Sequence, residues 1–264
     1  MSTYVIGDIH GCYDHLINML NMINLTDSDC LIFVGDYIGY GAQNYKMLKW
    51  LYNLEGIGNT IDITFLKGDH DIQFVSTVKL LKSMCDVKGW KRHSLKSTKE
   101  TYELAYEMMK TAKTSFDDTQ LLSTLIYNDY LTIEELLHYS LNFEKMMLGI
   151  KLFIANKTHV VVHAGYLSST TRMFYGHEDR DHFSTYANKE AFLYGGYKHG
   201  VVISGHNPTI RPGFFFNNGE VFRYYNSDND CIYYDIDCGC GLGNENINAH
   251  LACIRLEDKA FFYV

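Results

Sequence analysis

The stretch YVIGDIHGCYDHL, residues 4–16, joins a short strand-like run to a glycine-rich turn and then to the start of a helix. Tyr4–Ile6 favours a strand, and apolar residues recur at helical spacing between His15 and Ile23. The loop between them carries Asp8 and His10, so polar side chains follow the carboxyl end of a strand. This order of elements is typical of an α/β fold with a site at one edge of its sheet.

The same order of elements recurs further along the chain. Cys30–Val34 predicts a second strand, the loop GDYIGYG follows at residues 35–41, and Tyr45–Leu54 has helical spacing. Ile61–Leu66 predicts a third strand. Towards the C-terminus, short apolar runs separated by turn residues predict a second, largely antiparallel sheet. These runs are His159–Val162, Gly200–Ile203, Val221–Tyr225, Cys231–Ile236, Leu251–Leu256 and Ala260–Val264.

The long region between Asp71 and Phe153 has helical character. Thr132 and Glu135 have the spacing of a capping box, which predicts that a helix begins there. We therefore expect one domain over residues 1–264, with a helical insertion at roughly 72–150.

The composition is that of a globular protein, with 47% hydrophobic and 20% charged residues. The formal net charge of −8 argues against binding to a nucleic acid duplex, because that needs clustered Lys and Arg. The seven cysteines lack the paired spacing of a disulfide framework or a zinc ribbon, so we expect a reducing, cytoplasmic compartment. Neither a signal-peptide pattern nor an apolar run of about 18 residues occurs, so no membrane association is expected.

Residues able to bind metal ions follow several of the predicted strands. They are Asp8, His10, Asp36, Asp69, His70, His163 and His206. Loops at the carboxyl ends of strands converge on one edge of a sheet, so these side chains can meet although they are far apart in sequence. A mixture of carboxylates and imidazoles suits Mn²⁺, Fe or Zn²⁺ better than Ca²⁺ or a structural zinc. Two divalent ions are expected about 3.5–4 Å apart, with Asp36 between them and a hydroxide held for in-line attack on phosphorus.

Five motifs in this order, GDIHGCYDHL, GDYIGYG, LKGDHD, VVHAG and ISGHNPT, resemble the calcineurin-like metallophosphoesterases. The resemblance is to the phosphoprotein phosphatase branch, which includes phage and bacterial Ser/Thr phosphatases and symmetrical diadenosine tetraphosphatases. It implies a four-layer αββα sandwich of two mixed sheets with flanking helices and a helical insertion. The metal ligands it implies are Asp8 and His10 for the first ion, Asp36 as the bridge, and Asp69, His163 and His206 for the second. His70 resembles the general acid that protonates the leaving oxygen.

Three residues depart from this family pattern. Gly39 stands where the family usually has an Asp that orients the acid His, and Tyr40 stands where it usually has an Arg that clamps phosphate. Asp69 replaces a common Asn and adds a negative charge at the second metal. The residues expected to bind substrate are Tyr40, Arg172 and Arg180. The candidates to compensate for the missing Arg are Arg172, Arg180 and Arg211.

The sequence therefore predicts a metal-dependent hydrolase of phosphate esters or anhydrides, with His70 and Asp36 as its catalytic residues and Mn²⁺ as the first choice of metal. Its predicted substrate is a phosphorylated protein or a dinucleoside polyphosphate, and its activity is expected to be altered or reduced. The alternative, from a different class, is a catalytically impaired metal-containing protein that binds a phosphorylated ligand or a nucleotide.

Overall fold

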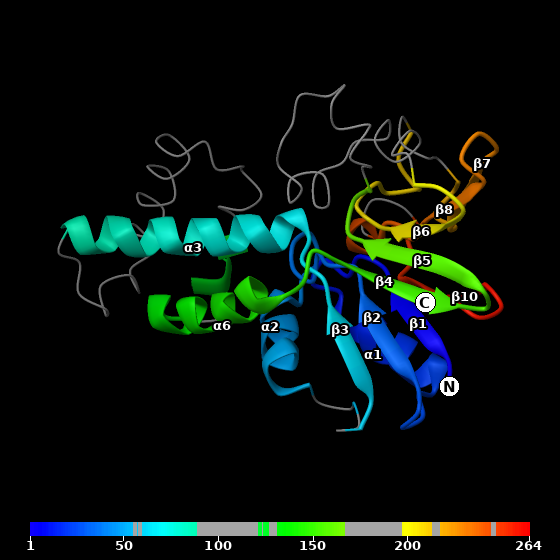
Figure 1. Cartoon of the computed structure of the whole chain (residues 1–264). Helices are drawn as coiled ribbons and strands as arrows, with labels where there is room; N and C mark the ends of the chain where they lie inside the picture. Colours follow the sequence, from blue (N-terminus) through cyan, green and yellow to red (C-terminus); the bar gives the residue numbers. More distant parts are fainter. Residues whose placement is uncertain are drawn as a thin grey trace.

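The structure, a computed structural model, describes residues 1–54, 57, 60–88, 121–122, 124–126, 131–166, 197–212, 217–243 and 247–264. Its strands form two sheets of five strands each (Figure 1). The first sheet has the order β10-β9-β1-β2-β3, with β1 Thr3–Ile6, β2 Cys30–Phe33, β3 Asp62–Phe65, β9 Ala252–Arg255 and β10 Ala260–Tyr263. The second has the order β4-β5-β6-β8-β7, with β4 Gly149–Ile154, β5 Lys157–Val162, β6 Gly200–Ser204, β7 Phe222–Asn226 and β8 Cys231–Asp235.

The two sheets pack face to face around an apolar layer. Val5 and Ile32 of the first sheet share one buried cluster with Val161 and Ile203 of the second. Successive side chains of a strand point to opposite faces, so Ile6 lies instead in the cluster beneath the helices. The first sheet is therefore buried on both faces, which explains why its central strands are continuous apolar runs.

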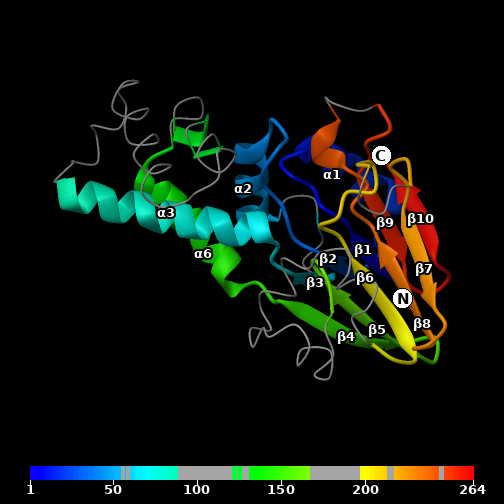
Figure 2. The same ribbon diagram turned by 90° about the horizontal axis from the view of Figure 1, so that it is seen from above.

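In the described part of the chain, four α-helices flank the sandwich, and their apolar faces share a core with the outer face of the first sheet. They are α1 Tyr13–Ile23, α2 Asn44–Asn53, α3 Asp69–Lys88 and α6 Ile133–Lys145. Figures 1 and 2 show α3 and α6 side by side, extending away from the sheets. Helix α6 begins at the predicted capping box, in which Thr132 and Glu135 bond to each other's backbone N–H groups. None of the described helices is long and apolar enough to cross a membrane.

The fold class is confirmed: two mixed sheets flanked by helices form an α/β sandwich. Three details differ from expectation. The second sheet is mixed instead of largely antiparallel, because β5, β6 and β8 pair in parallel. The last two strands do not join that sheet, since β9 pairs with β1 and β10 pairs with β9.

The third difference is β4, which lies in a stretch expected to be helical. It pairs with β5 through a turn at Ala155 and Asn156, whose φ angles are 49° and 62°. Two consecutive left-handed residues make the tight turn that suits a twisted hairpin, and Asn-Gly is its usual sequence signal. This turn has the sequence Ala155-Asn156, so the usual signal is absent from it.

Each sheet contains three neighbouring strands that run parallel to one another. β1, β2 and β3 run in the same direction in the first sheet, as β5, β6 and β8 do in the second. The loops at their carboxyl ends carry the polar residues singled out in the sequence, so the fold gathers them at one edge of the sandwich.

Candidate metal centre and active site

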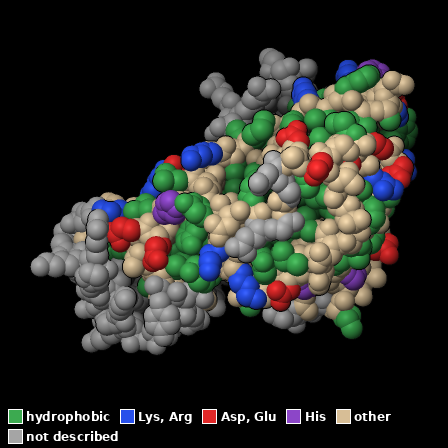
Figure 3. Space-filling model, turned by 90° about the horizontal axis from the view of Figure 1, so that it is seen from below, with side chains coloured by type: hydrophobic (Ala, Val, Ile, Leu, Met, Phe, Trp, Pro, Cys, Tyr) green, Lys and Arg blue, Asp and Glu red, His purple; other side chains and the backbone are tan. Residues whose placement is uncertain are grey.

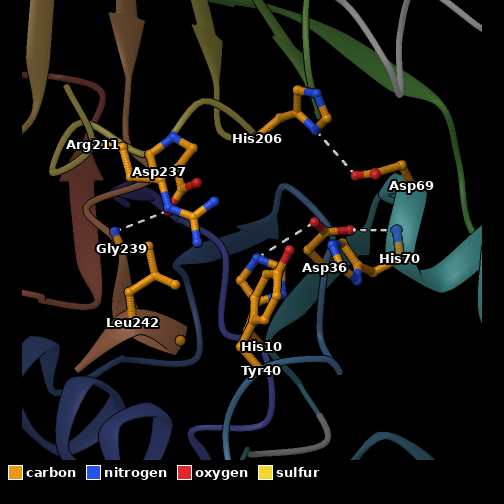
Figure 4. A pocket seen from close by; sticks show the side chains of 12 residues that line it. His10, Asp36, Tyr40, Asp69, His70, His206, Arg211, Asp237, Gly239 and Leu242 are labelled. Atoms are coloured by element: carbon orange, nitrogen blue, oxygen red, sulfur yellow. Dashed lines mark hydrogen bonds and ion pairs between the residues drawn. The ribbon is translucent and has the colours of Figure 1, made fainter. Parts of the chain in front are cut away.

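Each predicted metal-binding residue follows a strand, as expected. Asp8 and His10 follow β1, Asp36 follows β2, His163 follows β5 and His206 follows β6. Asp69 and His70, after β3, are the first two residues of α3. Figure 4 shows the side chains of His10, Asp36, Asp69, His70 and His206 around one pocket.

The structure brings six of these residues into two groups whose ligand atoms lie within 4.8 Å of one another. One group is Asp36, Asp69, His163 and His206, and the other is His10, Asp36 and His70. Asp36 belongs to both. Its Oδ2 lies 3.6 Å from His10 Nε2 and 3.6 Å from His163 Nε2. A carboxylate shared between two groups of ligands is the arrangement that a two-ion site needs.

The first group has the electrostatics of a cation site. His163 Nδ1 lies 3.1 Å from the Val34 carbonyl oxygen, to which it can donate its only N–H. Burial lowers the pKa of His163 to about 4, although a hydrogen bond to Asp69 works in the opposite direction, so the ring is neutral at pH 7. Its Nε2 then presents a lone pair to Asp69 Oδ1 at 3.1 Å. Electron pairs facing each other at this distance fit a cation between them.

The two carboxylates of this group differ. Burial raises the pKa of Asp36, and the neighbouring carboxylates of Asp69 and Asp8 raise it further. Burial also works to raise the pKa of Asp69, whereas ring protons of His163 and His206, or a cation in their place, lower it below its usual range. His206 Nδ1 lies 3.0 Å from Asp69 Oδ1. Nitrogens of two imidazole rings therefore lie within 3.1 Å of the same Asp69 oxygen.

Asp8 lies beside these groups but belongs to neither of them. Its Oδ2 accepts a 2.9 Å hydrogen bond from the backbone N–H of His206. Its Oδ1 is buried and has no hydrogen-bond partner among the described residues. Because an ionised buried oxygen without a partner is costly, this atom also fits a metal ion bound close to it.

Asp71 is a site residue that the sequence interpretation missed. Its fully buried carboxylate accepts hydrogen bonds from the N–H groups of Asp36, Tyr37 and Gly68, at 2.8, 3.1 and 2.8 Å. It therefore joins the loop that carries Asp36 to the loop that carries Asp69. Burial raises its pKa to about 7. The available signal was its place two residues after Asp69 in the motif LKGDHD.

The pocket beside the metal groups has an empty volume of about 590 Å³, including the space open to solvent at its mouth. Its other lining residues include Tyr40, Pro208, Arg211, Asp237 and Leu242. The Arg211 guanidinium lies 5.9 Å from the centroid of the Tyr40 ring (Figure 4). The structure thus places Arg211 at the pocket, whereas Arg172 and Arg180 lie outside the described residues.

Asp237 is a second lining residue that the sequence interpretation missed. It directly follows β8 in the same way that the other site residues follow their strands, and this position was the signal. Its carboxylate is buried and accepts a 2.9 Å hydrogen bond from the Gly239 N–H. Burial raises its pKa to about 6, while His206 and Arg211 act to lower it.

His70 lies at the edge of the pocket, among aromatic rings. Its ring centroid is 4.9 Å from that of His10 and 5.1 Å from that of Tyr40. Its backbone N–H donates a 3.0 Å hydrogen bond to Asp36 Oδ1, which fixes its main chain at the start of α3. Among the described residues, no carboxylate forms a hydrogen bond with its ring within the usual distance limits.

The conformation of Gly39 is one reason that no carboxylate from the loop at residues 35–41 forms a hydrogen bond with the His70 ring. It has a φ of 146°, a conformation that side chains rarely adopt, and a Cβ there would lie 2.7 Å from His10 Nδ1 and 3.4 Å from His70 Nδ1. Asn44 holds the loop by accepting from the Gly39 N–H at 2.8 Å and donating to its carbonyl at 3.0 Å. The backbone at Gly39 thus faces both rings, with no room for a side chain.

The fold and these groups define an α/β sandwich with a cluster of Asp and His residues suited to metal ions. Residues 1–209, most of the chain, match the model of the family described as calcineurin-like phosphoesterase. The chain therefore belongs to the calcineurin-like phosphoesterase family, and this membership supports a hydrolase.

Individual relatives match less of the chain. The symmetrical bis(5'-nucleosyl)-tetraphosphatases of Salmonella typhimurium and Salmonella typhi are each 36% identical to it over 77 residues, which is 29% of this chain and 26% of theirs. The match thus spans about a quarter of the length of these curated relatives.

Two solved structures share the fold over the whole chain. One is of a candidate diadenosine tetraphosphatase, with a TM-score of 0.56 and 17% identity, covering 100% of this chain and 92% of that one. The other is a hypothetical protein of Pyrococcus horikoshii OT3, with a TM-score of 0.52 and 10% identity, covering 100% and 86%. At these identities the similarity concerns the fold alone.

Proposed function

We propose that this chain is a phosphoesterase that hydrolyses a phosphate ester or anhydride with two divalent cations, Mn²⁺ first and Fe or Zn²⁺ as alternatives. The observation that carries the proposal is the position of Asp36, which belongs to both groups of potential ligands. When bound, such cations supply Lewis acidity at the phosphate and lower the pKa of a coordinated water.

The residues proposed to hold the ions are those of the two groups except His70, which is proposed as the acid. Asp69, His163 and His206 bind one ion, His10 binds the other, and Asp36 lies between them. Asp8, whose buried Oδ1 has no hydrogen-bond partner among the described residues, is proposed to join His10 at the same ion. The mixture of oxygen and imidazole nitrogen donors suits Mn²⁺, Fe or Zn²⁺.

His70 is proposed to donate the proton that the leaving oxygen needs. It lies at the pocket, partly exposed, and an imidazole N–H can be donated to a leaving oxygen. Because Gly39 provides no carboxylate, the orientation of the ring depends on its packing against His10 and Tyr40. An acid that is oriented by packing alone supports a reduced rate, since loss of an orienting partner typically costs roughly 10–100-fold.

Arg211 and Tyr40, which also line the pocket, are proposed to bind the substrate. A guanidinium can hold phosphate oxygens with two hydrogen bonds, and the Tyr40 hydroxyl can supply one. Arg172 and Arg180 remain expectations of the sequence. Because the single guanidinium of Arg211 holds a phosphate dianion weakly, substrates with additional binding groups are favoured over small monoesters. A dinucleoside polyphosphate is therefore proposed first and a phosphoprotein second.

A specific observation also supports the second candidate function, a catalytically impaired protein that binds a phosphorylated ligand or a nucleotide. The carboxylate of Asp69 contacts both His163 and His206, and its negative charge opposes a phosphate dianion. With Gly39 and Tyr40 in the adjoining loop, binding without turnover is the alternative outcome.

The organisation of the chain enters the proposal as well. We keep one domain over residues 1–264 with an insertion at roughly 72–150, supported by the way α3 and α6 extend together away from the sheets (Figure 2). All seven cysteines are free thiols, which suits the cytoplasmic compartment expected from the sequence. On the face shown in Figure 3, Lys and Arg are interspersed with Asp and Glu, unlike a surface that binds a nucleic acid duplex.

The test is turnover by the purified chain with Mn²⁺ on an aryl phosphate monoester, an aryl diester and diadenosine tetraphosphate. The proposal expects hydrolysis of at least one substrate and loss of hydrolysis on chelation, with diadenosine tetraphosphate turned over fastest. Tight binding of the nucleotide without turnover of any substrate, in protein that contains metal, establishes the second candidate instead.

A further inference from the structure

A third group of potential metal ligands lies outside the proposed catalytic centre. It consists of Cys12, His15 and Cys240, whose two sulfur atoms and a ring nitrogen all lie within 4.8 Å of one another. Cys240 is buried, Cys12 is half-buried and His15 is exposed. Neither catalytic group contains a sulfur ligand.

The fold builds this group from both ends of the chain. Cys12 is the residue immediately before α1, and His15, three residues later, lies in the first turn of the helix. Residues three apart on a helix lie on the same face, so both side chains can point to one place. Cys240 begins the short 3₁₀ helix Cys240–Leu242. The Cys12 thiol donates a hydrogen bond to the Cys240 carbonyl oxygen at 3.4 Å, which holds the two segments together.

Two thiols and one imidazole form a ligand set that favours thiophilic ions. Zn²⁺ commonly binds Cys sulfur and His nitrogen with tetrahedral geometry, at about 2.3 and 2.0–2.1 Å. Ligand atoms within 4.8 Å of one another can reach such a geometry with small side-chain rotations. Because His15 is exposed, the fourth position faces solvent and can hold water.

We propose that Cys12, His15 and Cys240 bind a thiophilic divalent cation such as Zn²⁺, and that this ion fixes one wall of the active-site pocket to the N-terminus of α1. The ion replaces the two thiol protons, which pass to solvent. Gly241 and Leu242, next to Cys240, line the pocket. A Cβ on Gly241 would lie 2.7 Å from His10 Cβ, so the segment that the ion holds packs directly against a proposed catalytic-centre residue.

Cobalt binding tests this proposal on the intact chain, because Co²⁺ bound to thiolate has a sulfur-to-metal charge-transfer absorption that Asp and His ligands cannot give. Reduced protein is titrated with Co²⁺, and the absorption is expected to appear, saturate and disappear when Zn²⁺ is added. Cys12→Ser and Cys240→Ser should abolish it. His15→Ala should weaken Co²⁺ affinity at this site by about 10-fold or more, since losing even an outer partner of a ligand costs roughly that much.

Cys30→Ser is the matched control, because Cys30 is another half-buried thiol and lies at the opposite end of β2 from the catalytic loop. It should retain the absorption in full. Circular dichroism shows whether Cys240→Ser folds, and the half-buried Cys12→Ser provides a second test if it does not. The proposal is overturned if the wild-type chain gives no charge-transfer absorption, or if folded Cys12→Ser keeps it.

Discussion

Two parts of the candidate active site are built very differently. The metal wall, defined as Asp36, Asp69, His163 and His206, is buried apart from the half-buried His206, and each residue comes from a different loop fixed by backbone hydrogen bonds. The substrate wall, made here of Tyr40 and Arg211, is more open, and Tyr40 is 42% exposed. Of the departures from the family pattern, Tyr40 belongs to the substrate wall and Gly39 is the residue before it in the chain.

This difference separates two kinds of chemistry. A metal site tolerates little displacement, because its ligands must converge on one point with their lone pairs aligned. A partly exposed phosphate contact contributes less and can be replaced by a cation from another loop. The expected consequence is that substitutions in the metal wall abolish activity, whereas substitutions in the substrate wall change affinity and selectivity.

The largest effect is expected for Asp36→Asn. Loss of the shared carboxylate should reduce phosphoesterase activity by at least about 10²-fold, as for removal of one preorganised electrostatic group. Turnover of the preferred substrate measures this loss of activity. Mass spectrometry of the folded protein measures how much bound metal is lost with the carboxylate. Asp62→Asn, an exposed carboxylate at the start of β3, is the control and should behave as wild type.

Asp71→Ala should have the next largest effect, because it lowers the stability of the fold. It leaves the N–H groups of Asp36, Tyr37 and Gly68 without their acceptor, at about 1–3 kcal/mol for each buried unsatisfied group. Urea unfolding should therefore show a loss of several kcal/mol in the free energy of unfolding. Asp71→Asn, which keeps one acceptor oxygen, should lose clearly less, and equal losses would contradict this role.

Gly39 allows a matched pair of substitutions. Gly39→Ala places a Cβ 2.7 Å from His10 Nδ1 at a φ of 146°, so we expect metal affinity and activity to fall by roughly 10–100-fold. Gly39→Asp has the same steric cost but adds a carboxylate near His70. If an unoriented acid limits the rate, Gly39→Asp should be faster than Gly39→Ala in single-turnover measurements. Equal rates would mean that packing alone orients His70 sufficiently.

Arg211→Ala should weaken substrate binding without disturbing the metal wall. Loss of a charge-assisted contact that is partly exposed should raise KM by about 10-fold, with kcat reduced less. Metal content should be unchanged. Arg223→Ala removes an exposed Arg from β7 and serves as the control. An unchanged KM in Arg211→Ala would exclude Arg211 from the substrate wall.

The smallest effect is expected for Tyr40→Arg. An added guanidinium at a position that is 42% exposed should contribute about 0.2–1 kcal/mol, so KM for an aryl phosphate should fall by no more than about fivefold. Tyr40→Phe controls for the hydroxyl group. A gain that disappears at high salt would identify the contact as an exposed electrostatic one.

The sequence predicted the parts of this molecule whose signals are local. Apolar runs predicted nearly all strands. The polar residues that follow these runs predicted the loops that bring Asp36, Asp69 and His206 together. The pairing of β9 with β1 could not be predicted, because β9 is separated from β1 by most of the chain and local periodicity contains no information on its neighbour. Asp71 was missed because it acts on backbone N–H groups, and its interaction depends on how two distant loops meet.

The most direct test of the central claim is anomalous diffraction from crystals grown with Mn²⁺, recorded on both sides of the manganese absorption edge. The account predicts two anomalous peaks per chain, both within bonding distance of the Asp36 carboxylate, one beside His163 and His206 and the other beside His10. A single peak, or peaks that do not contact Asp36, would contradict it.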